Sequence, residues 1–357
     1  MIIIDNVLYF PILKTTDAEL RAFEHLDATV KENIIPIFEL TKSRKSKKNM
    51  NRCISKRLEM LKEVVGANPF ILDLTTEKQL SNEQIDKILD EHAGGFPLWV
   101  DLIKENKEAG LNIIPVIHYD EQNVYDVKKE IEELFKLSSV LAFRVPVADA
   151  IDYLKQMVAM GVPLEKLIVI LDAEYQEPRG NGDKSYLFTG VVDLIIKEFS
   201  SNLPRCVLCA FSSFPDSVAK YGEDDRGGWV RYEKITYEAL KSKYANVRGL
   251  SLKYSDYSSV HPYRYDTTGG QWIPRIDFTN NTHMLYYRAR REDGGYPYVA
   301  KLVLKDPNYS PISNLVVWGD EEIFSAANGM PNGSSPSHWI SVRINLYITR
   351  TVMELIE

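Results

Sequence analysis

The stretch LIVILDA, residues 167–173, decides the fold that we expect of this chain. It is a continuous run of mostly branched apolar residues, and runs whose two faces are both apolar are typical of strands in a buried parallel sheet. Seven further stretches have the same character: IPIFELT (35–41), FILDL (70–74), IIPVIHY (113–119), VLAFRVPV (140–147), RCVLCAFSS (205–213), VRGLSLKY (247–254) and THMLYYRAR (282–290). The sequence therefore predicts eight strands.

Amphipathic segments with helical spacing of their apolar residues separate these strands. They cover residues 49–66, 96–110, 121–137, 149–161, 185–201 and 233–245. Alternation of strands and helices is typical of an α/β fold with a parallel sheet, and eight strands favour a (β/α)8 barrel of the TIM type. A doubly wound open sheet is the alternative, because closure of a sheet leaves no mark in the sequence.

The expected barrel has additions at both ends. We expect residues 1–34 to form an N-terminal extension with a helix at about 17–32, and residues 35–357 to form a single barrel domain. Long loop insertions are expected at about 214–232 and 255–338, which show no clear period. Fourteen of the 20 tyrosines and four of the five tryptophans lie between residues 221 and 347. Loops of this length in a compact domain usually carry function.

Composition narrows the class of protein. The 357 residues are 45% hydrophobic and 26% charged, which is typical of a globular protein with a large core. A net charge of −7 excludes a generally basic nucleic-acid coat but leaves room for a local basic patch. Three cysteines exclude a disulfide framework and favour the reducing cytoplasm. No apolar run approaches the roughly 18 residues of a membrane span, so we expect no membrane partner.

Short motifs are scattered along the whole chain. They are YFPILK (9–14) followed by Glu19, the strand sequences IPIFEL, LDL and IPVIHY, AFRVP around Arg144, ILDAE (170–174), GLSLKYSDYS (249–258) and SPSHW (335–339). Together they resemble the beta protein family of phage and bacterial genomes. The resemblance implies a barrel-like fold and a phage or mobile-element setting, with host–phage conflict as one such setting. It implies no established chemistry and transfers no catalytic residue.

Charged and polar side chains follow directly after several of the expected strands. Active sites of (β/α)8 enzymes lie at the carboxyl ends of their strands, so these side chains should converge on one mouth. The candidate catalytic residues are Glu39, Asp73, His118, Arg144 and Asp172. Carboxylates and an imidazole could hold a divalent metal such as Mg²⁺. The alternative is that Asp73 and Asp172 cap the next helices or pair with Arg144, and we favour such a structural Arg144 pair.

A basic segment follows the first expected strand. From Lys42 to Leu58 the chain reads KSRKSKKNMNRCISKRL, with eight basic residues and no acidic one. A nucleotide or nucleic acid is the natural partner of such a segment, and the alternative is a solvated surface that aids solubility. Lys253 ends an expected strand, and SPSHW is a candidate lid over the mouth. The ligand-binding candidates are thus Lys42, Lys45, Lys47, Lys48, Lys253, His338 and Trp339.

These observations support two main functional hypotheses. The first is a barrel protein of phage–host conflict, either antiviral or phage-encoded, that recognises and in a further step hydrolyses a phosphorylated or nucleic-acid ligand at its mouth. The second is a non-catalytic scaffold that binds a partner protein of a defence system through its aromatic loops, since aromatic residues are enriched in protein interfaces. A hydrolase of carbohydrates or phosphate esters is a third. The sequence does not decide whether the protein is an enzyme.

Overall fold

The computed structural model of the protein describes residues 4–47, 49–180, 182–264, 272–312 and 314–357. Its main sheet contains eight parallel strands in the order β4-β3-β2-β1-β9-β7-β6-β5. They are β1 (Tyr9–Lys14), β2 (Ile37–Leu40), β3 (Phe70–Leu74), β4 (Ile113–Pro115), β5 (Leu141–Pro146), β6 (Leu167–Tyr175), β7 (Cys206–Ser212) and β9 (Leu252–Asp256). A bridge between Val116 and Ala142 joins the two edges, so the sheet is nearly closed into a barrel. The expected α/β class with an eight-stranded parallel sheet is confirmed.

Two strands differ from the sequence prediction. The segment Tyr9–Lys14, expected within the N-terminal extension, is strand β1 and lies between β2 and β9 in the sheet. Its apolar run is short and contains Pro11, which hides the pattern of a central strand. The predicted strand at 282–290 is wrong as a barrel strand, because His283–Arg288 forms β11 of a separate antiparallel sheet. That strand buries only one face, as antiparallel strands commonly do.

Side chains of the barrel strands alternate between the barrel interior and the layer of helices outside it. In β6, Ile168 and Ile170 belong to the interior cluster, whereas Leu167, Val169 and Leu171 pack with the helices. This is the period of two that pleated backbone imposes. Both layers are apolar along most of each strand, which explains the unbroken apolar runs in the sequence.

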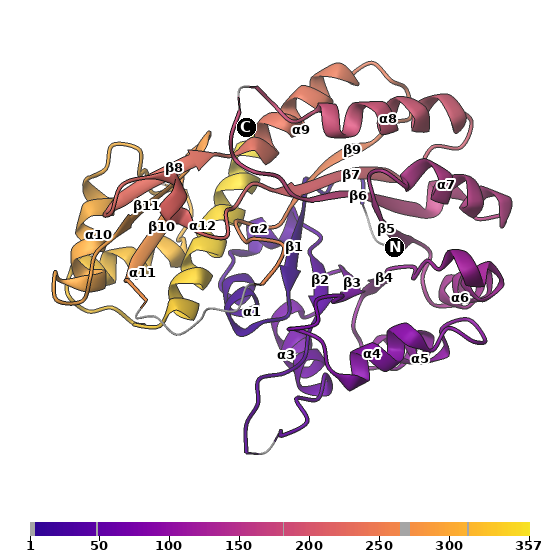
Figure 1. The fold of residues 1–357 in the computed structure, drawn as a ribbon, viewed down its shortest axis with the longest axis horizontal. Coiled ribbons are helices and arrows are strands. Elements are labelled where there is room, and N and C mark those ends of the chain that lie inside the picture. Colours follow the sequence, from indigo (N-terminus) through magenta and orange to yellow (C-terminus); the bar gives the residue numbers. More distant parts are fainter. Residues whose placement is uncertain (1–3, 48, 181, 265–271, 313) are drawn as a thin grey trace.

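Helices cover the outside of the barrel sheet (Figure 1). Most lie where the sequence predicts them, although the expected helix at 17–32 is divided in two. They are α1 (Asp17–Glu24), α2 (Ala28–Glu32), α3 (Ser55–Val65), α4 (Glu83–Asp90), α5 (Pro97–Glu108), α6 (Val124–Leu137), α7 (Ala150–Ala159), α8 (Tyr186–Glu198) and α9 (Tyr232–Lys243). None of the helices that the structure describes is long and apolar enough to cross a membrane.

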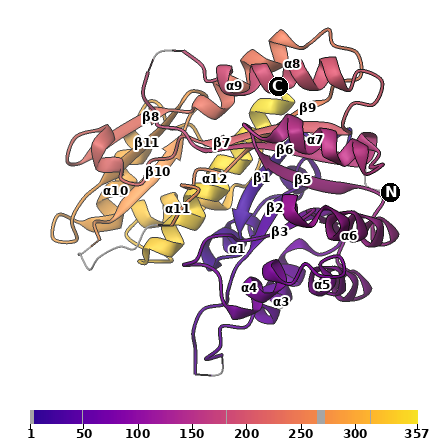
Figure 2. The same cartoon turned by 45° about the vertical axis from the view of Figure 1, so that its right-hand side comes forward.

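A lobe beside the barrel holds much of the region that was expected to be loop. It contains the antiparallel strands β8 (Arg226–Val230), β10 (Arg275–Thr279) and β11 and the helices α10 (Gly295–Lys305) and α11 (Trp318–Ala327). The long helix α12 (Pro336–Ile356) contacts both α1 of the barrel and β10 of the lobe. Figures 1 and 2 show α12, in yellow, running between the two parts. The aromatic residues of this region therefore build a second core.

Candidate functional site

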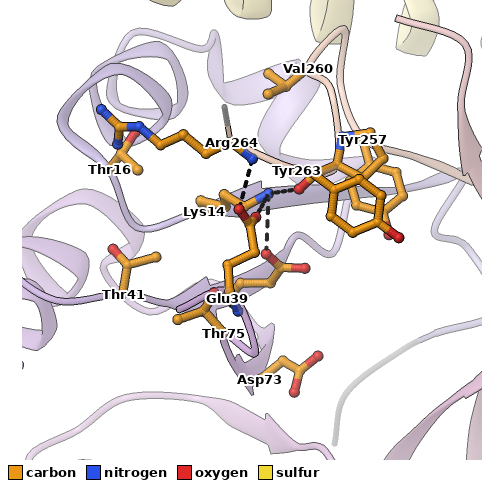
Figure 3. Close-up of polar contacts among 12 residues, drawn as sticks. Lys14, Thr16, Glu39, Thr41, Asp73, Thr75, Tyr257, Val260, Tyr263 and Arg264 are labelled. Atoms are coloured by element: carbon orange, nitrogen blue, oxygen red, sulfur yellow. Dashed lines mark hydrogen bonds and ion pairs between the residues drawn. The ribbon is translucent and has the colours of Figure 1, made fainter. Parts of the chain in front are cut away.

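Charged side chains cap the interior of the barrel at the carboxyl end of its strands. Because interior positions recur every second residue, Lys14 follows Ile12, Glu39 follows Ile37, and Asp73 follows Ile71 on the inner face. In the sheet, Glu39 pairs with Lys14 on one side and with Asp73 on the other. Figure 3 shows Lys14 directed at Glu39, with Asp73 beside them. We call Lys14, Glu39, Asp73, Arg144, Asp172 and Tyr257 the mouth cluster.

Arg144 lies at the centre of the mouth cluster. Its Nη1 is 2.7 Å from Glu39 Oε1 and 3.0 Å from Asp73 Oδ2. Its Nε donates to Asp172 Oδ2 at 2.8 Å, and its Nη2 donates to the Tyr257 hydroxyl at the same distance. Only 16% of the Arg144 side chain is exposed. The predicted pairing of Arg144 with Asp73 and Asp172 is therefore present, and Glu39 joins it.

A second cation, Lys14, completes the cluster. Its Nζ lies 2.8 Å from Glu77 Oε1 and 3.6 Å from Glu39 Oε2, and it also donates to the Pro262 carbonyl. The Tyr257 hydroxyl in turn donates to Asp172 Oδ2 at 2.6 Å. Both cations of the mouth are thus neutralised by carboxylates.

The pKa values of two neighbouring carboxyls of the mouth cluster, Glu39 and Asp73, shift in opposite directions. Burial raises the pKa of Glu39, but Lys14 and Arg144 outweigh it and hold that pKa below its usual value. Burial also raises the pKa of Asp73, and there Arg144 does not compensate because the Glu39 charge adds to the rise. Neighbouring carboxyls whose pKa values are driven apart are a pattern of acid–base sites. Asp73 is thus the carboxyl of the cluster whose pKa is raised, and Glu39 the one whose pKa is lowered.

The segment after β9 crosses the mouth. The Arg264 backbone N–H donates to Glu77 Oε2 at 2.7 Å, and the Tyr263 hydroxyl donates to Glu174. The His261 ring packs on Tyr175, with ring centroids 4.5 Å apart. This segment, residues 257–264, therefore connects the loop after β3 to the end of β6 and covers the Lys14 side chain.

Strained backbone lies at the same place. Glu174, Ser258 and Ser259 have φ values of +53°, +50° and +64°, a region that non-glycine residues seldom occupy. Glu174 lies two residues after Asp172, and its backbone N–H donates to Asp172 Oδ1 at 2.8 Å. Such strain persists where surrounding contacts fix it, and it is frequent at functional sites.

His118 belongs to the same end of the barrel but not to the Arg144 network. Its Nδ1 lies 3.3 Å from Glu130 Oε1 of α6, and its ring packs against Trp99 with centroids 4.7 Å apart. Burial raises the pKa of Glu130, which His118 partly offsets. His118 thus links β4 to the helix layer.

Three other candidates lie away from the mouth. Lys253 Nζ donates to the carbonyl of Asp5, a residue that precedes β1, so Lys253 sits at the opposite end of the barrel. His338 and Trp339 lie in the first turns of α12 and are largely buried: His338 Nε2 is 2.9 Å from Glu322 Oε2, and Trp339 stacks on Tyr296. The expectation that SPSHW covers the mouth is therefore wrong, because these side chains pack into the core of the lobe.

The basic segment borders an open cavity between α1 and α3. The cavity has a volume of about 520 Å³ and is lined by Arg21, Arg44, Lys45, Lys56 and Arg57 together with Asp17, Glu24 and Glu63. Lys45 and Lys47 are exposed and Lys42 is partly buried, whereas Lys48 lies outside the described residues. The segment begins directly after β2, at the mouth end of the barrel.

The geometry also bears on the magnesium hypothesis. In the described part of the chain, no three His, Cys, Asp or Glu side chains are arranged to hold a metal ion. The carboxylates that were expected to bind one are instead joined by the Arg144 guanidinium. The mouth cluster therefore gives the magnesium hypothesis no support.

Sequence reasoning missed Lys14 and Tyr257. Lys14 ends the run YFPILK just as Glu39 ends its own strand, so the same rule of strand ends would have found it had Tyr9–Lys14 been taken as a strand. Tyr257 lies beyond the end of β9 in a tyrosine-rich stretch, and no local pattern separates it from its neighbours.

Comparisons with known proteins agree with the motifs. The chain is 28% identical to "Protein beta" of Enterobacteria phage P4 over 356 residues, which cover 98% of this chain and 94% of that one. Among solved structures, the biosynthetic arginine decarboxylase SpeA of Campylobacter jejuni superposes with a TM-score of 0.38 at 9% identity, and this chain spans 57% of its length. The family model described as Beta protein matches residues 9–353. Since that match covers nearly the whole chain, the chain belongs to the Beta protein family.

Proposed function

We propose that this protein recognises a phosphorylated or nucleic-acid ligand in a phage–host setting, and that the basic segment supplies the contacts. The observation that carries the proposal is the cavity between α1 and α3, where five cationic side chains face three acidic ones. Arginine and lysine side chains that line an open groove attract phosphates and set their position.

The cavity suits an anion better than the mouth does. In the mouth, Lys14 and Arg144 each contact two or more carboxylates, so an incoming phosphate would meet net negative charge. At the cavity, Arg44 and Lys45 are exposed. The buried Arg57 donates to Asp17 through Nη1, while its Nε has no hydrogen-bond partner among the described residues. A phosphate oxygen could satisfy that buried N–H.

We place hydrolysis at the mouth only for an uncharged bond of the ligand, with its phosphates held on the basic segment, which begins at that end of the barrel. In this step water is the nucleophile: Glu39, whose pKa is lowered, accepts a proton from the attacking water, and Asp73, whose pKa is raised, donates its proton to the leaving group as the bond to it breaks. Such a step requires the covering segment 257–264 to admit the ligand. Asp73→Asn should then abolish turnover and leave binding of the ligand unchanged.

The experiment measures binding of a fluorescent oligonucleotide by anisotropy at several salt concentrations. Replacing Lys45, Lys47 and Lys48 by Glu should weaken binding and make the salt slope shallower by about 0.9 for each phosphate contact that is lost on duplex DNA. The control replaces three exposed lysines of α6, Lys128, Lys129 and Lys136, by Glu, which changes the net charge equally. Equal weakening by both triple variants, or no binding by the wild type, would refute the proposal.

Apolar side chains exposed on the lobe favour the alternative of a scaffold that binds a partner protein. Five of them lie between residues 273 and 330: Ile273, Tyr298, Val316, Phe324 and Met330. Contiguous patches of exposed apolar side chains commonly mark protein-binding surfaces, and these five are the residues from which such a patch on the lobe would be built. If this alternative holds, Val316→Asp and Phe324→Asp will abolish association with a co-expressed defence protein and leave the barrel folded.

A further inference from the structure

A second open cavity lies in the lobe, away from the mouth and from the basic segment. Its volume is about 340 Å³, and it lies among β10, the start of α10 and the start of α12. Its lining includes three aromatic side chains, Trp272, Tyr296 and Trp339. Tyr296 and Trp339 are stacked with ring centroids 4.5 Å apart, and Trp272 lies 5.8 Å from Tyr296. Because Trp272 is only partly buried, it forms an accessible wall for a flat ring.

A buried carboxylate also lines this cavity. Asp277 is 4% exposed, and its Oδ2 accepts hydrogen bonds from Arg275 Nε at 3.1 Å and from Arg343 Nη1 at 3.2 Å. Its other oxygen, Oδ1, receives no hydrogen bond from any described residue. Arg275 Nε lies 3.0 Å from Oδ1 as an ion pair, but its N–H does not point there. A buried oxygen without a donor is costly, and a ligand N–H that displaces the Arg275 side chain from Oδ1 would satisfy it.

Arginine side chains surround the aromatic wall. Arg275 and Arg288 line the cavity, and the Arg291 guanidinium lies 4.5 Å from the centre of the Trp272 ring. Arg288 Nε donates to the carbonyl of Asp224, which fixes the side chain. Among the described residues that line the cavity, Asp277 is the only acidic one, and two arginines already share its charge. The cavity is therefore positive overall.

We infer that this cavity binds a nucleotide whose base carries an exocyclic amino group, such as an adenine nucleotide. The base stacks on the face of Trp272 that the Arg291 guanidinium does not cover. The amino group of the base donates to Asp277 Oδ1, and the phosphate of the nucleotide pairs with Arg288 and Arg275. Aromatic stacking together with arginine is a common means of holding a base, and a carboxylate that accepts from an amino group selects among bases. Within the described part of the chain, the two cavities share no lining residue.

Titration of the full chain with AMP, followed by tryptophan fluorescence and calorimetry, tests this inference. AMP should quench the fluorescence and bind more tightly than ribose 5-phosphate, which lacks the base, and than purine riboside 5′-monophosphate, which lacks only the amino group. Trp272→Ala should weaken AMP binding by about fivefold or more. Tyr298→Ala, an exposed aromatic of α10 outside the cavity lining, is the matched control and should bind AMP as the wild type does.

A second variant tests the polar contact. Asp277→Asn should remove the preference for AMP over purine riboside 5′-monophosphate. If loss of the ion pair with Arg343 unfolds this variant, AMP binding by Trp272→Ala still tests the inference. The Glu variants of Lys45, Lys47 and Lys48 should keep AMP binding, which separates this site from the basic segment. Absence of AMP binding, equal binding of AMP and ribose 5-phosphate, or equal loss in Tyr298→Ala and Trp272→Ala would overturn the inference.

Discussion

Removal of Arg144 tests the account of the mouth cluster most directly. The guanidinium contacts Glu39, Asp73 and Asp172 at 2.7–3.0 Å, and each of these carboxylates is 7–8% exposed. Arg144→Ala leaves these acids close together without their shared cation. Breaking a buried ion pair by removing one partner costs about 3–5 kcal/mol, mainly because the remaining charge is uncompensated. We expect the free energy of unfolding at pH 7 to fall by that amount.

The stability that Arg144→Ala loses should be larger at neutral pH than in acid. Although burial opposes it, the nearby cations lower the pKa of Glu39 in the folded state. Glu39 therefore contributes stability above its unfolded-state pKa of about 4.3, and this contribution disappears as the pH falls through the folded-state value. Without Arg144 the carboxylates gain protons more easily in the folded state. The gap between the wild type and Arg144→Ala should be widest at pH 7 and should narrow below about pH 4.

Urea unfolding followed by circular dichroism at pH 7 and pH 4 measures both quantities. The matched control is Arg205→Ala, which removes an arginine whose Nη2 lies 2.8 Å from Asp5, with the two side chains 38% and 68% exposed. Exposed pairs of this kind contribute about 0–1 kcal/mol. If Arg144→Ala destabilises the protein no more than Arg205→Ala does, or if its loss does not shrink in acid, the explanation of the cluster is incorrect.

Three further predictions concern other parts of the fold. Burial raises the pKa of Glu233, which accepts hydrogen bonds from Ser213, to about 7. The contribution of Glu233 to stability is complete below its unfolded-state pKa of about 4.3 and is lost as the pH rises through 7. Glu233→Gln should therefore flatten the fall in melting temperature between pH 5 and pH 8. An unchanged slope would count against this prediction. A Cβ at Gly228 would lie 2.5 Å from the Met284 carbonyl oxygen, so Gly228→Ala should lower the melting temperature. Gly190→Ala in α8, where nothing lies within 4 Å, should instead raise stability by about 0.5–1 kcal/mol, and a reversed order in thermal melts would contradict both.

Much of the candidate site could be predicted from single strands. Glu39, Asp73 and Asp172 were found because each follows an apolar run, and the inner face of a barrel strand continues into the polar residue two positions on. The same rule found Arg144, and the structure joins all four. It also led us to expect that Arg144 pairs with Asp73 and Asp172, but it did not show that Glu39 joins them or that Lys14 contacts Glu39, since the direction of long side chains depends on neighbours that are far away in sequence.

The sequence by itself determined the local pattern: alternating strands and helices, two apolar strand faces, and polar residues at the strand ends. Only the tertiary structure decided which segments complete the sheet. Tyr9–Lys14 joins it through pairs such as Tyr9 with Tyr254, whereas His283–Arg288 pairs with β8 and β10 instead. Pairing of strands depends on partners that can lie hundreds of residues away, as Tyr254 does from Tyr9, and a strand's own residues do not specify those partners. For the same reason, Trp339 and His338 could be placed only after α12 was seen to pack against the lobe.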